Sequence, residues 1–284
     1  MDSADSFLRS YLYVPGVDEH RITKALESPA DAIVIDLEDA VTLDRKSQAR
    51  RMAGDVISTP HGKPVFVRIN SFASGLADQD MAELHGPGLS GIRLPKTESA
   101  DQVNRVAVTV GGRSRRVAVV ALIESALGLE RAASIAAAEG VTALALGEAD
   151  LGADLGVTSD EGLLYSRSRC VAAARASDKI AIQSVYSDLD DLDGLAKSTL
   201  RGRQLGFTGR SAVHPTQVNV INDVLTPTDE ERHWAEEIIG AYQRSVELGS
   251  GVAVTANGRF IDEAVVRSAR TVLRLAELSQ RNRA

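Results

Sequence analysis

Cysteine and aromatic side chains are scarce in this chain of 284 residues, and basic residues are fewer than acidic ones. Cys170 is the single cysteine, so no disulfide can form within the chain. Aromatic residues make up 4% of the sequence, the formal net charge is −7, and no run of Lys and Arg is interleaved with aromatic residues. This composition argues against a nucleic-acid-binding surface. An anionic ligand would have to meet a local group of basic residues.

Long hydrophobic runs and several common site motifs are also absent. No apolar stretch approaches the roughly 20 residues that span a bilayer, and the N-terminal MDSADSFLRS lacks the basic and apolar regions of a secretory signal. We therefore expect a cytoplasmic protein without a membrane partner. Glycine-rich nucleotide loops and the G-x-S-x-G serine motif are missing, and the five histidines show no His-x-x-x-His spacing, which disfavours zinc.

Short apolar runs that end on charged residues recur along the chain. AIVIDLEDA places Asp36, Glu38 and Asp39 after such a run, VFVRIN ends on Arg68, and VAVVALIES ends on Glu124. Continuous apolar runs of this length are typical of strands buried on both faces, as in a parallel sheet covered by helices. Eight strands are expected, at Tyr11–Val14, Ala32–Asp36, Val65–Ile69, Gly91–Leu94, Val117–Ile123, Ala143–Leu146, Lys179–Ile182 and Phe207–Val213.

Helix-patterned segments rich in Ala, Leu, Arg and Glu alternate with these strands. This order indicates repeated βα units, and eight units predict a closed α/β barrel over residues 1–225. In such barrels the rim at the carboxyl ends of the strands carries the chemistry, so the charged residues at the strand ends are the first site candidates. The expected helices include Asp44–Ile57, Ala126–Glu139, Glu161–Ala176 and Leu189–Gln204.

Residues 226–284 follow a different pattern and are expected to form a helical extension outside the barrel. A capped, acidic helix start follows Thr226 and the helix runs to about Leu248. The segment GSGVAVTANGRFID then interrupts helical periodicity, and a last amphipathic helix runs from Glu263 to about Leu278. The glycine-rich segment is either a lid over the barrel mouth or a hairpin packed on its side, and the pattern leaves both open.

Glu124 and Asp150 are the strongest candidates for a metal site. Glu124 follows seven apolar residues, and Asp150 comes 26 residues later (150 − 124), at the expected end of the next strand. Neighbouring parallel strands lie about 4.8 Å apart, so both carboxylates could reach one cation. Two carboxylates completed by waters and substrate oxygens suit Mg²⁺. The alternative is that these acids cap helices or form ion pairs at the rim, and Glu148 is the weaker neighbour of Asp150.

Four other positions each have a functional and a structural interpretation. Arg68 either pairs with a rim acid or binds an anion bidentately, and we favour the ligand. Lys96 could form a Schiff base, although a positioned loop charge is commoner. His214 could act as a base or could hold a turn through a hydrogen bond. Asp36 is expected to cap a buried loop.

Nine short motifs in order make the chain resemble the citrate lyase beta subunit and malyl-CoA lyase family. The resemblance covers nearly the whole chain. It implies a TIM barrel, commonly trimeric, that binds Mg²⁺ and cleaves or forms a carbon–carbon bond in a 3-hydroxyacyl-CoA such as malyl-CoA or citramalyl-CoA. The expected products are acetyl-CoA and a 2-keto acid. The motifs are YLYVPG, DLEDAV, VRIN, LPKTES, LIES, GEADLGADLG, YSRSRCVAAARA, GFTGRSAVHPTQV and NGRFID.

The resemblance also implies roles for single residues. Glu124 and Asp150 would hold Mg²⁺ and, through it, the keto-acid portion of the substrate. Arg68 would contact the substrate and stabilise developing negative charge. Asp262, supplied by the C-terminal segment to a neighbouring subunit, would transfer the proton. Without the resemblance, an acid that opens a helix would be expected to be a cap.

The remaining implied residues surround the metal and the CoA. Glu38 and Asp39 would hold metal-bound waters, while Arg21 and Lys24 would meet CoA. A solvated helix face explains this last pair nearly as well. The chain departs from the family at Gln183, where relatives often carry an aspartate, and this departure leaves the substrate open. The alternatives are a citryl-cleaving subunit of a citrate lyase complex and a noncatalytic acyl-CoA-binding protein.

Overall fold

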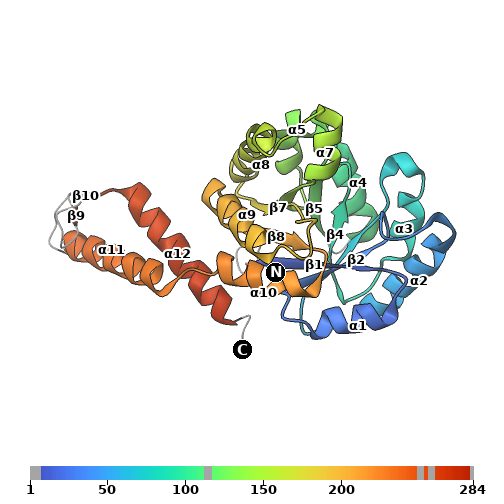
Figure 1. The fold of residues 1–284 in the computed structure, drawn as a ribbon, viewed down its shortest axis with the longest axis horizontal. Coiled ribbons are helices and arrows are strands. Elements are labelled where there is room, and N and C mark those ends of the chain that lie inside the picture. Colours follow the sequence, from blue (N-terminus) through green and yellow to red (C-terminus); the bar gives the residue numbers. More distant parts are fainter. Residues whose placement is uncertain (1–7, 112–116, 248–252, 255–259, 282–284) are drawn as a thin grey trace. The chain divides into compact units, whose positions relative to one another are not determined.

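The protein is built around a closed barrel of eight parallel strands. A computed structural model describes residues 8–111, 117–247, 253–254 and 260–281. The strands follow one another in chain order around the barrel, β1 closes against β8, and helices surround them (Figure 1). The expected TIM barrel is confirmed. The strands are β1 (Ser10–Pro15), β2 (Ala32–Asp36), β3 (Val65–Arg68), β4 (Leu89–Leu94), β5 (Ala118–Ile123), β6 (Val141–Leu146), β7 (Ile180–Gln183) and β8 (Gly209–Ala212).

Helices follow each strand, as the alternating pattern predicts. Three short 3₁₀ helices, η1 (Leu43–Arg45), η2 (Phe72–Ser74) and η3 (Glu161–Leu163), lie in the loops. The α-helices of the barrel are α1 (Glu19–Glu27), α2 (Lys46–Ile57), α3 (Ala77–Glu83), α4 (Ala100–Gly111), α5 (Ala126–Glu130), α6 (Ala132–Ala136), α7 (Glu148–Leu155), α8 (Leu164–Arg175), α9 (Leu192–Leu205) and α10 (Pro215–Leu225).

Each strand is buried on both of its faces, which explains the continuous apolar runs. In β2, Ala32 and Val34 belong to a cluster inside the barrel, together with Tyr11 and Phe66. The alternate residues of β2, including Ile33, pack in the layer between the strands and the helices. Alternation therefore separates two hydrophobic clusters instead of an apolar face and a wet face.

Two expectations about element boundaries are wrong. The helix expected over Ala126–Glu139 is divided into α5 and α6, because Arg131 between them has ψ near 4°. Asp150 does not end a strand: β6 stops at Leu146, and Asp150 lies in the first turn of α7. A helix start attracts carboxylates because its free N–H groups and dipole carry partial positive charge.

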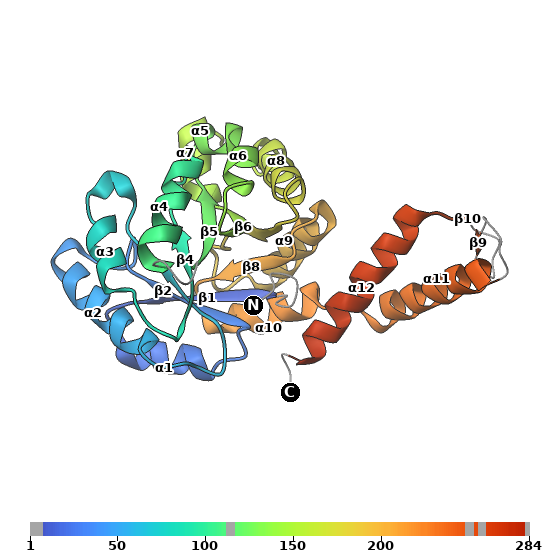
Figure 2. The ribbon, with the colours of Figure 1, turned by 180° about the vertical axis from the view of Figure 1, so that it is seen from behind.

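The described residues from Thr226 onward belong to a second compact unit, distinct from the Leu8–Leu225 unit. Its helices α11 (Asp229–Glu247) and α12 (Glu263–Arg281) run side by side and share a cluster of buried apolar residues (Figure 2). The short strands β9 (Ala253–Val254) and β10 (Phe260–Ile261) pair antiparallel between them. Most of the glycine-rich segment lies outside the described residues, so the choice between lid and packed hairpin stays a prediction.

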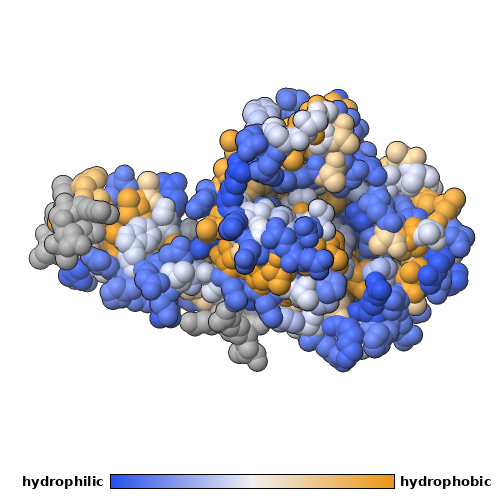
Figure 3. Space-filling model, in the orientation of Figure 1, coloured by the Kyte–Doolittle hydropathy of each residue, from blue (hydrophilic) through white to orange (hydrophobic). Residues whose placement is uncertain are grey.

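The start of α11 confirms the expected cap. The Thr228 hydroxyl accepts a hydrogen bond from the Glu231 amide, and the Glu231 carboxylate accepts one from the Thr228 amide. This reciprocal pair is a capping box. In the part of the chain that the structure describes, no helix combines the length and apolar character needed to cross a bilayer. Hydrophilic residues cover most of the face drawn in Figure 3, and hydrophobic residues form smaller separate areas on it.

Candidate active site

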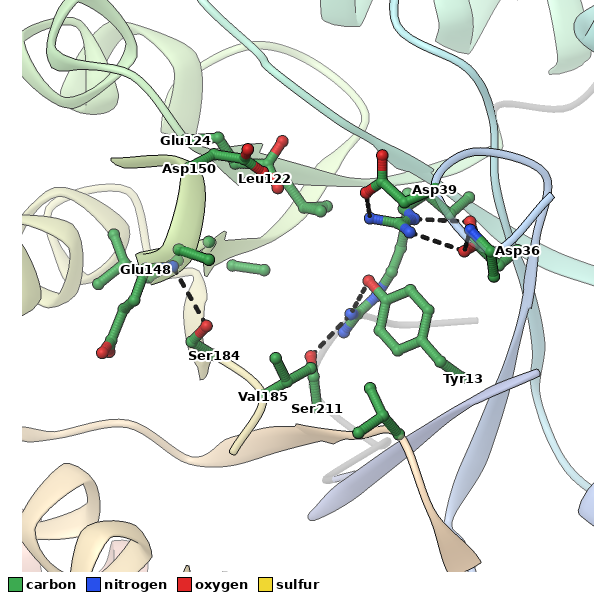
Figure 4. A pocket seen from close by; sticks show the side chains of 18 of the residues that line it. Tyr13, Asp36, Asp39, Leu122, Glu124, Glu148, Asp150, Ser184, Val185 and Ser211 are labelled. Atoms are coloured by element: carbon green, nitrogen blue, oxygen red, sulfur yellow. Dashed lines mark hydrogen bonds and ion pairs between the residues drawn. The ribbon is translucent and has the colours of Figure 1, made fainter. Parts of the chain in front are cut away.

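A cavity of about 460 Å³ lies at the carboxyl ends of the barrel strands. All eight strands, or the loops directly after them, contribute to its wall, as expected for a barrel active site. Figure 4 shows a crowd of charged side chains around it. The lining residues are Tyr13, Val14, Pro15, Arg21, Asp36, Asp39, Ala40, Arg68, Arg93, Leu122, Glu124, Ala145, Leu146, Gly147, Glu148, Ala149, Asp150, Ser184, Val185, Ser211 and Val213.

Glu124 and Asp150 come together in this cavity. Both line it, and Figure 4 shows their carboxylates in the same part of the wall. Glu124 is buried with 6% of its surface exposed, whereas Asp150 is exposed. The two acids therefore face one centre even though Asp150 reaches it from a helix and not from a strand.

The position of Glu124 depends on two close backbone contacts. Its Oε2 atom accepts a 2.7 Å hydrogen bond from the Lys96 amide, while Oε1 has no hydrogen-bond partner among the described residues. A Cβ atom on Gly147 would lie 2.5 Å from both Cγ and Oε1 of Glu124, so only glycine fits there. Lys96 itself has φ of 49°, in the left-handed region that side-chain-bearing residues seldom adopt. Backbone strain thus directs an N–H at the carboxylate.

Burial raises the pKa of Glu124 above its usual value. The Lys96 hydrogen bond and the Arg68 charge oppose this effect, while the charge of Asp150 adds to it. A carboxylate that is buried beside a second carboxylate gains from a bound cation. The free Oε1 and the Asp150 carboxylate are hard oxygen donors, as Mg²⁺ prefers, and two protein ligands suffice for an ion that keeps several waters. The described residues contain no group of three or more His, Cys, Asp or Glu arranged to hold a metal.

Arg68 is held by a ring of acids. Its Nε and Nη2 donate 2.7 Å hydrogen bonds to the two oxygens of Asp36, and Nη1 lies 3.2 Å from Glu38 and 3.0 Å from Asp39. The structural partner weighed for Arg68 is thus present, in Asp36. Because the bidentate edge is occupied, a substrate could meet Arg68 only at the remaining Nη1 or through the guanidinium face. Its substrate role stays a prediction.

Glu38 and Asp39 occupy different environments. Asp39 lines the cavity and its side chain is largely exposed, whereas Glu38 is buried and is not among the lining residues. Burial raises the pKa of Glu38 to about 7, against the Arg68 charge, while Asp39 and Glu124 raise it further. Glu38 also accepts a 3.2 Å hydrogen bond from the Lys96 Nζ. The role of this pair around metal-bound waters is untested.

The two residues assigned to CoA differ in position. Arg21 lines the cavity, although it also pairs with Asp18 on its own helix at 3.1 Å. Lys24 is not among the lining residues, and its Nζ pairs with Glu27 at 2.9 Å. Both side chains are about two-thirds exposed, as a solvated helix face requires. The geometry therefore keeps Arg21 as the stronger candidate of the two.

Asp262 lies in the C-terminal unit, directly before α12. Its Oδ1 accepts a 2.8 Å hydrogen bond from the Val265 amide, and its carbonyl accepts one from Val266. This is the capping contact that an acid at a helix start commonly makes. Its proposed role in proton transfer is a prediction.

The structure also shows the partners of several other candidate residues near the cavity. Glu148 pairs with Arg167 at 2.6 Å and so contributes little free charge. His214 accepts from or donates to Thr216 at a turn, which is its structural interpretation. Lys96 is the positioned loop charge and not an unpaired amine. Sequence reasoning missed Arg93, although GIRL on β4 places it near a strand end in the same way that VFVR places Arg68.

Comparison with known proteins gives consistent results. The family model for HpcH/HpaI aldolase/citrate lyase matches residues 9–215. The beta subunit of citrate lyase from Escherichia coli is 34% identical, with 95% of this chain and 94% of that protein covered. Human mitochondrial citramalyl-CoA lyase is 32% identical, with 94% and 85% covered. The crystal structure of CitE from Mycobacterium tuberculosis in complex with magnesium, acetoacetate and coenzyme A has a TM-score of 0.80 at 30% identity and covers 96% of this chain and 99% of that one.

Proposed function

The chain belongs to the HpcH/HpaI aldolase/citrate lyase family, and we propose that it is a Mg²⁺-dependent lyase that cleaves or forms a 3-hydroxyacyl-CoA such as malyl-CoA or citramalyl-CoA. The products of cleavage are acetyl-CoA and a 2-keto acid. The observation that carries the proposal is the meeting of Glu124 and Asp150 in a cavity that Arg68 also lines. A family relative of similar length is a citramalyl-CoA lyase, and another binds magnesium and coenzyme A.

Glu124 and Asp150 would hold the Mg²⁺, for which their donor atoms are suited. When bound, the ion supplies a Lewis acid for the oxygen atom that becomes the keto group of the product. The chain's own contribution is to hold the Glu124 carboxylate in one orientation, through the hydrogen bond from the Lys96 amide and the close approach of Gly147. Preorganised charge of this kind needs no rearrangement during the reaction.

Arg68 and Asp262 would act on the acetyl-CoA fragment that leaves: Arg68 would stabilise its negative charge and Asp262 would protonate it. Cleavage breaks the bond between the hydroxyl-bearing carbon and the carbon next to the thioester. The hydroxyl gives its proton to water and becomes the keto oxygen, and the electron pair of the broken bond moves onto the thioester as an enolate. Arg68, fixed by Asp36, supplies positive charge that favours this species. Asp262 of a neighbouring subunit donates the proton that completes acetyl-CoA, and it removes the same proton in the condensation direction. A homotrimer in the cytoplasm is part of this proposal.

The decisive experiment is a substrate panel. Purified protein with Mg²⁺ is incubated with malyl-, methylmalyl-, citramalyl- and citryl-CoA, and keto-acid release is followed. We expect turnover of at least one thioester, with loss of about a hundredfold or more in Glu124→Gln and Asp150→Asn. Gly152→Ala is a matched control, because it lies on the same helix as Asp150 and a Cβ there meets nothing within 4 Å. Tight CoA binding without turnover would support a noncatalytic acyl-CoA-binding protein instead.

Similarity to the citrate lyase beta subunit supports a second candidate, the citryl-cleaving subunit of a complex. That function would require a partner that carries the acyl group. Copurification with an acyl-carrier protein, together with turnover of its citryl thioester and none of the free CoA thioesters, would favour it over the stand-alone lyase.

A further inference from the structure

Arg93 is a buried cation without a counter-ion. It lies on β4, none of its surface is exposed, and it lines the cavity. Its Nη1 donates to the Tyr13 hydroxyl at 2.8 Å and to the Ser211 hydroxyl at 2.9 Å. Among the described residues no carboxylate pairs with it, and its Nε and Nη2 have no hydrogen-bond partner. Burying a charge in this way is unfavourable unless an opposite charge compensates it.

The aromatic rings around Arg93 explain how the free protein tolerates the charge. The guanidinium carbon lies 4.6 Å from the centre of the Tyr11 ring and 5.2 Å from that of Tyr13. These contacts stabilise a cation, but they leave it without neutralisation. A ligand that brings negative charge to this end of the cavity would complete the set of interactions.

Two hydroxyl groups that accept hydrogen bonds from Arg93 lie at the cavity surface. Tyr13 and Ser211 both line the cavity, and each hydroxyl oxygen already accepts a hydrogen bond from Arg93. A hydroxyl has one hydrogen to donate, and neither donates it to another described residue. Both hydrogens are therefore available to a group inside the cavity. An acceptor held by two such donors, backed by a guanidinium, would be an anion.

This polar group lies away from the metal-binding acids. Figure 4 shows Tyr13 and Ser211 across the cavity from Glu124 and Asp150. Arg68 cannot serve the same purpose with its bidentate edge, which Asp36 occupies. The cavity thus has one end suited to a metal-bound oxygen and carboxylate, and another end suited to a second negative group.

We propose that Arg93, Tyr13 and Ser211 form a carboxylate subsite that selects thioesters whose hydroxyl-bearing carbon carries a carboxymethyl group, and with it a second carboxylate. The proposal rests on the proposed lyase function and changes its preferred substrate from malyl- or citramalyl-CoA to a citryl thioester. That carbon bears hydrogen in malyl-CoA, methyl in citramalyl-CoA and carboxymethyl in a citryl thioester. Only the last supplies a second anion for the Tyr13 and Ser211 hydroxyls, which the buried Arg93 guanidinium polarises. The released keto acid is then a dicarboxylate, oxaloacetate, and not pyruvate or glyoxylate.

The test compares kcat/KM for citryl-, citramalyl- and malyl-CoA in the wild type and three variants. The wild type is expected to favour citryl-CoA by at least about a hundredfold, since a site built for hydrogen bonding discriminates strongly against ligands that lack the group. Arg93→Met should lower the citryl-CoA value about a hundredfold and change the citramalyl-CoA value less than about threefold. Tyr13→Phe, which keeps the ring and removes one donor, should lower the citryl-CoA value about tenfold.

Arg105→Met is the matched control. Arg105 also lies over an aromatic ring, that of Phe72 at 4.8 Å, but it pairs with Asp78 and is not among the residues that line the cavity. Its replacement should leave all three kcat/KM values unchanged. If Arg93→Met fails to fold, Tyr13→Phe still tests the subsite, because it retains both ring contacts.

A binding measurement separates the subsite from the lyase reaction. Calorimetry with Mg²⁺ should show that wild-type protein binds oxaloacetate at least tenfold more tightly than pyruvate, and that Tyr13→Phe narrows the difference. Cleavage of citramalyl- or malyl-CoA as efficient as that of citryl-CoA, or an equal loss on all thioesters in Arg93→Met, overturns the subsite and leaves the lyase. No cleavage of any thioester, with no Mg²⁺-dependent binding of either keto acid, overturns both.

Discussion

Arg68 and Arg93 occupy equivalent positions on neighbouring strands and yet have opposite electrostatic surroundings. They are partners in register between β3 and β4, and both lie over the ring of Tyr13, at 5.1 and 5.2 Å. Arg68 pairs with three carboxylates, whereas no carboxylate among the described residues pairs with Arg93. Two arginines at the same level of the barrel thus differ in role. Arg68 holds three acids in place, whereas the charge of Arg93 remains available to a ligand.

The comparison separates structural charge from available charge. Asp36 is 1% exposed and uses both oxygens on Arg68 while also capping the loop after β2. Such a satisfied pair is expensive to break, and it leaves only Nη1 and the guanidinium face of Arg68 to meet a substrate. Among the described residues, Arg93 has only neutral hydroxyl acceptors and ring faces around it, so its positive charge is not neutralised within the protein.

Replacement of each arginine by methionine should show the largest difference. Arg68→Met leaves buried Asp36 without its cation and Glu38 with Lys96 alone, and should reduce the free energy of unfolding by about 3–5 kcal/mol. Arg93→Met strands no acid, and its two hydroxyl partners can bond to water in the cavity, so its effect should stay within about 1 kcal/mol. Urea unfolding measures both values. Equal destabilisation would show that the acids around Arg68 contribute nothing beyond packing.

Glu38 should make stability depend on pH, in the same direction as Glu124, whose pKa burial also raises. Burial raises its pKa in the folded state to about 7 from 4.5, so the folded state favours the protonated carboxyl. The associated stability, up to about 3 kcal/mol, is fully present below pH 4.5 and is lost as pH rises through 7. Unfolding in EDTA across this range should show the fall in wild-type protein.

Glu38→Gln should flatten that part of the pH profile. Arg93→Met is the control, because Arg93 is not among the charges that shift the pKa of Glu38. A wild-type profile that is flat between pH 4.5 and 7, or an unchanged slope in Glu38→Gln, would place the titration elsewhere.

The barrel could be predicted from the sequence because a strand buried on both faces appears in the sequence as a continuous apolar run. Runs such as Ala32–Ile35 are apolar at every position, and the charged residue that follows each run, here Asp36, marks the rim. Helix boundaries were less accessible. β6 ends at Leu146 and only Gly147 separates it from α7, so Asp150 lies at a helix start and not at the expected strand end, although it still lines the cavity.

The ion pairs within the site could not be predicted from any sequence pattern. DLEDAV shows three acids, but only the folded barrel reveals that all three converge on Arg68 and that Asp36 takes its bidentate edge. The left-handed φ of Lys96 was equally hidden, since lysine does not signal that conformation. Arg93 had the same strand-end signal as Arg68 and could have been chosen by it.

Gly147→Ala should weaken the metal-binding side without touching either arginine. The added Cβ would lie 2.5 Å from Cγ and Oε1 of Glu124, so the carboxylate must shift. We expect Mg²⁺ affinity, measured by calorimetry, to fall at least about tenfold, because a ligand displaced from its position loses coordination. Gly152→Ala, with open space around the new Cβ, should bind as the wild type does. Equal affinities of the two variants would remove Gly147 from the site.

Lys96 provides the smallest and sharpest test, because one residue serves Glu124 through its amide and Glu38 through its Nζ. Its φ of 49° disfavours any residue with a Cβ by about 1–2 kcal/mol relative to glycine. Lys96→Gly should therefore be about 1 kcal/mol more stable than Lys96→Ala, the reverse of the order in an ordinary loop or helix, although both remove the amine. Thermal and urea unfolding measure the difference. Since glycine keeps the amide directed at Glu124, Lys96→Gly should also retain Mg²⁺ affinity within about threefold. A more stable alanine variant would mean that the left-handed backbone, and with it the hydrogen bond to Glu124, is absent from the folded protein.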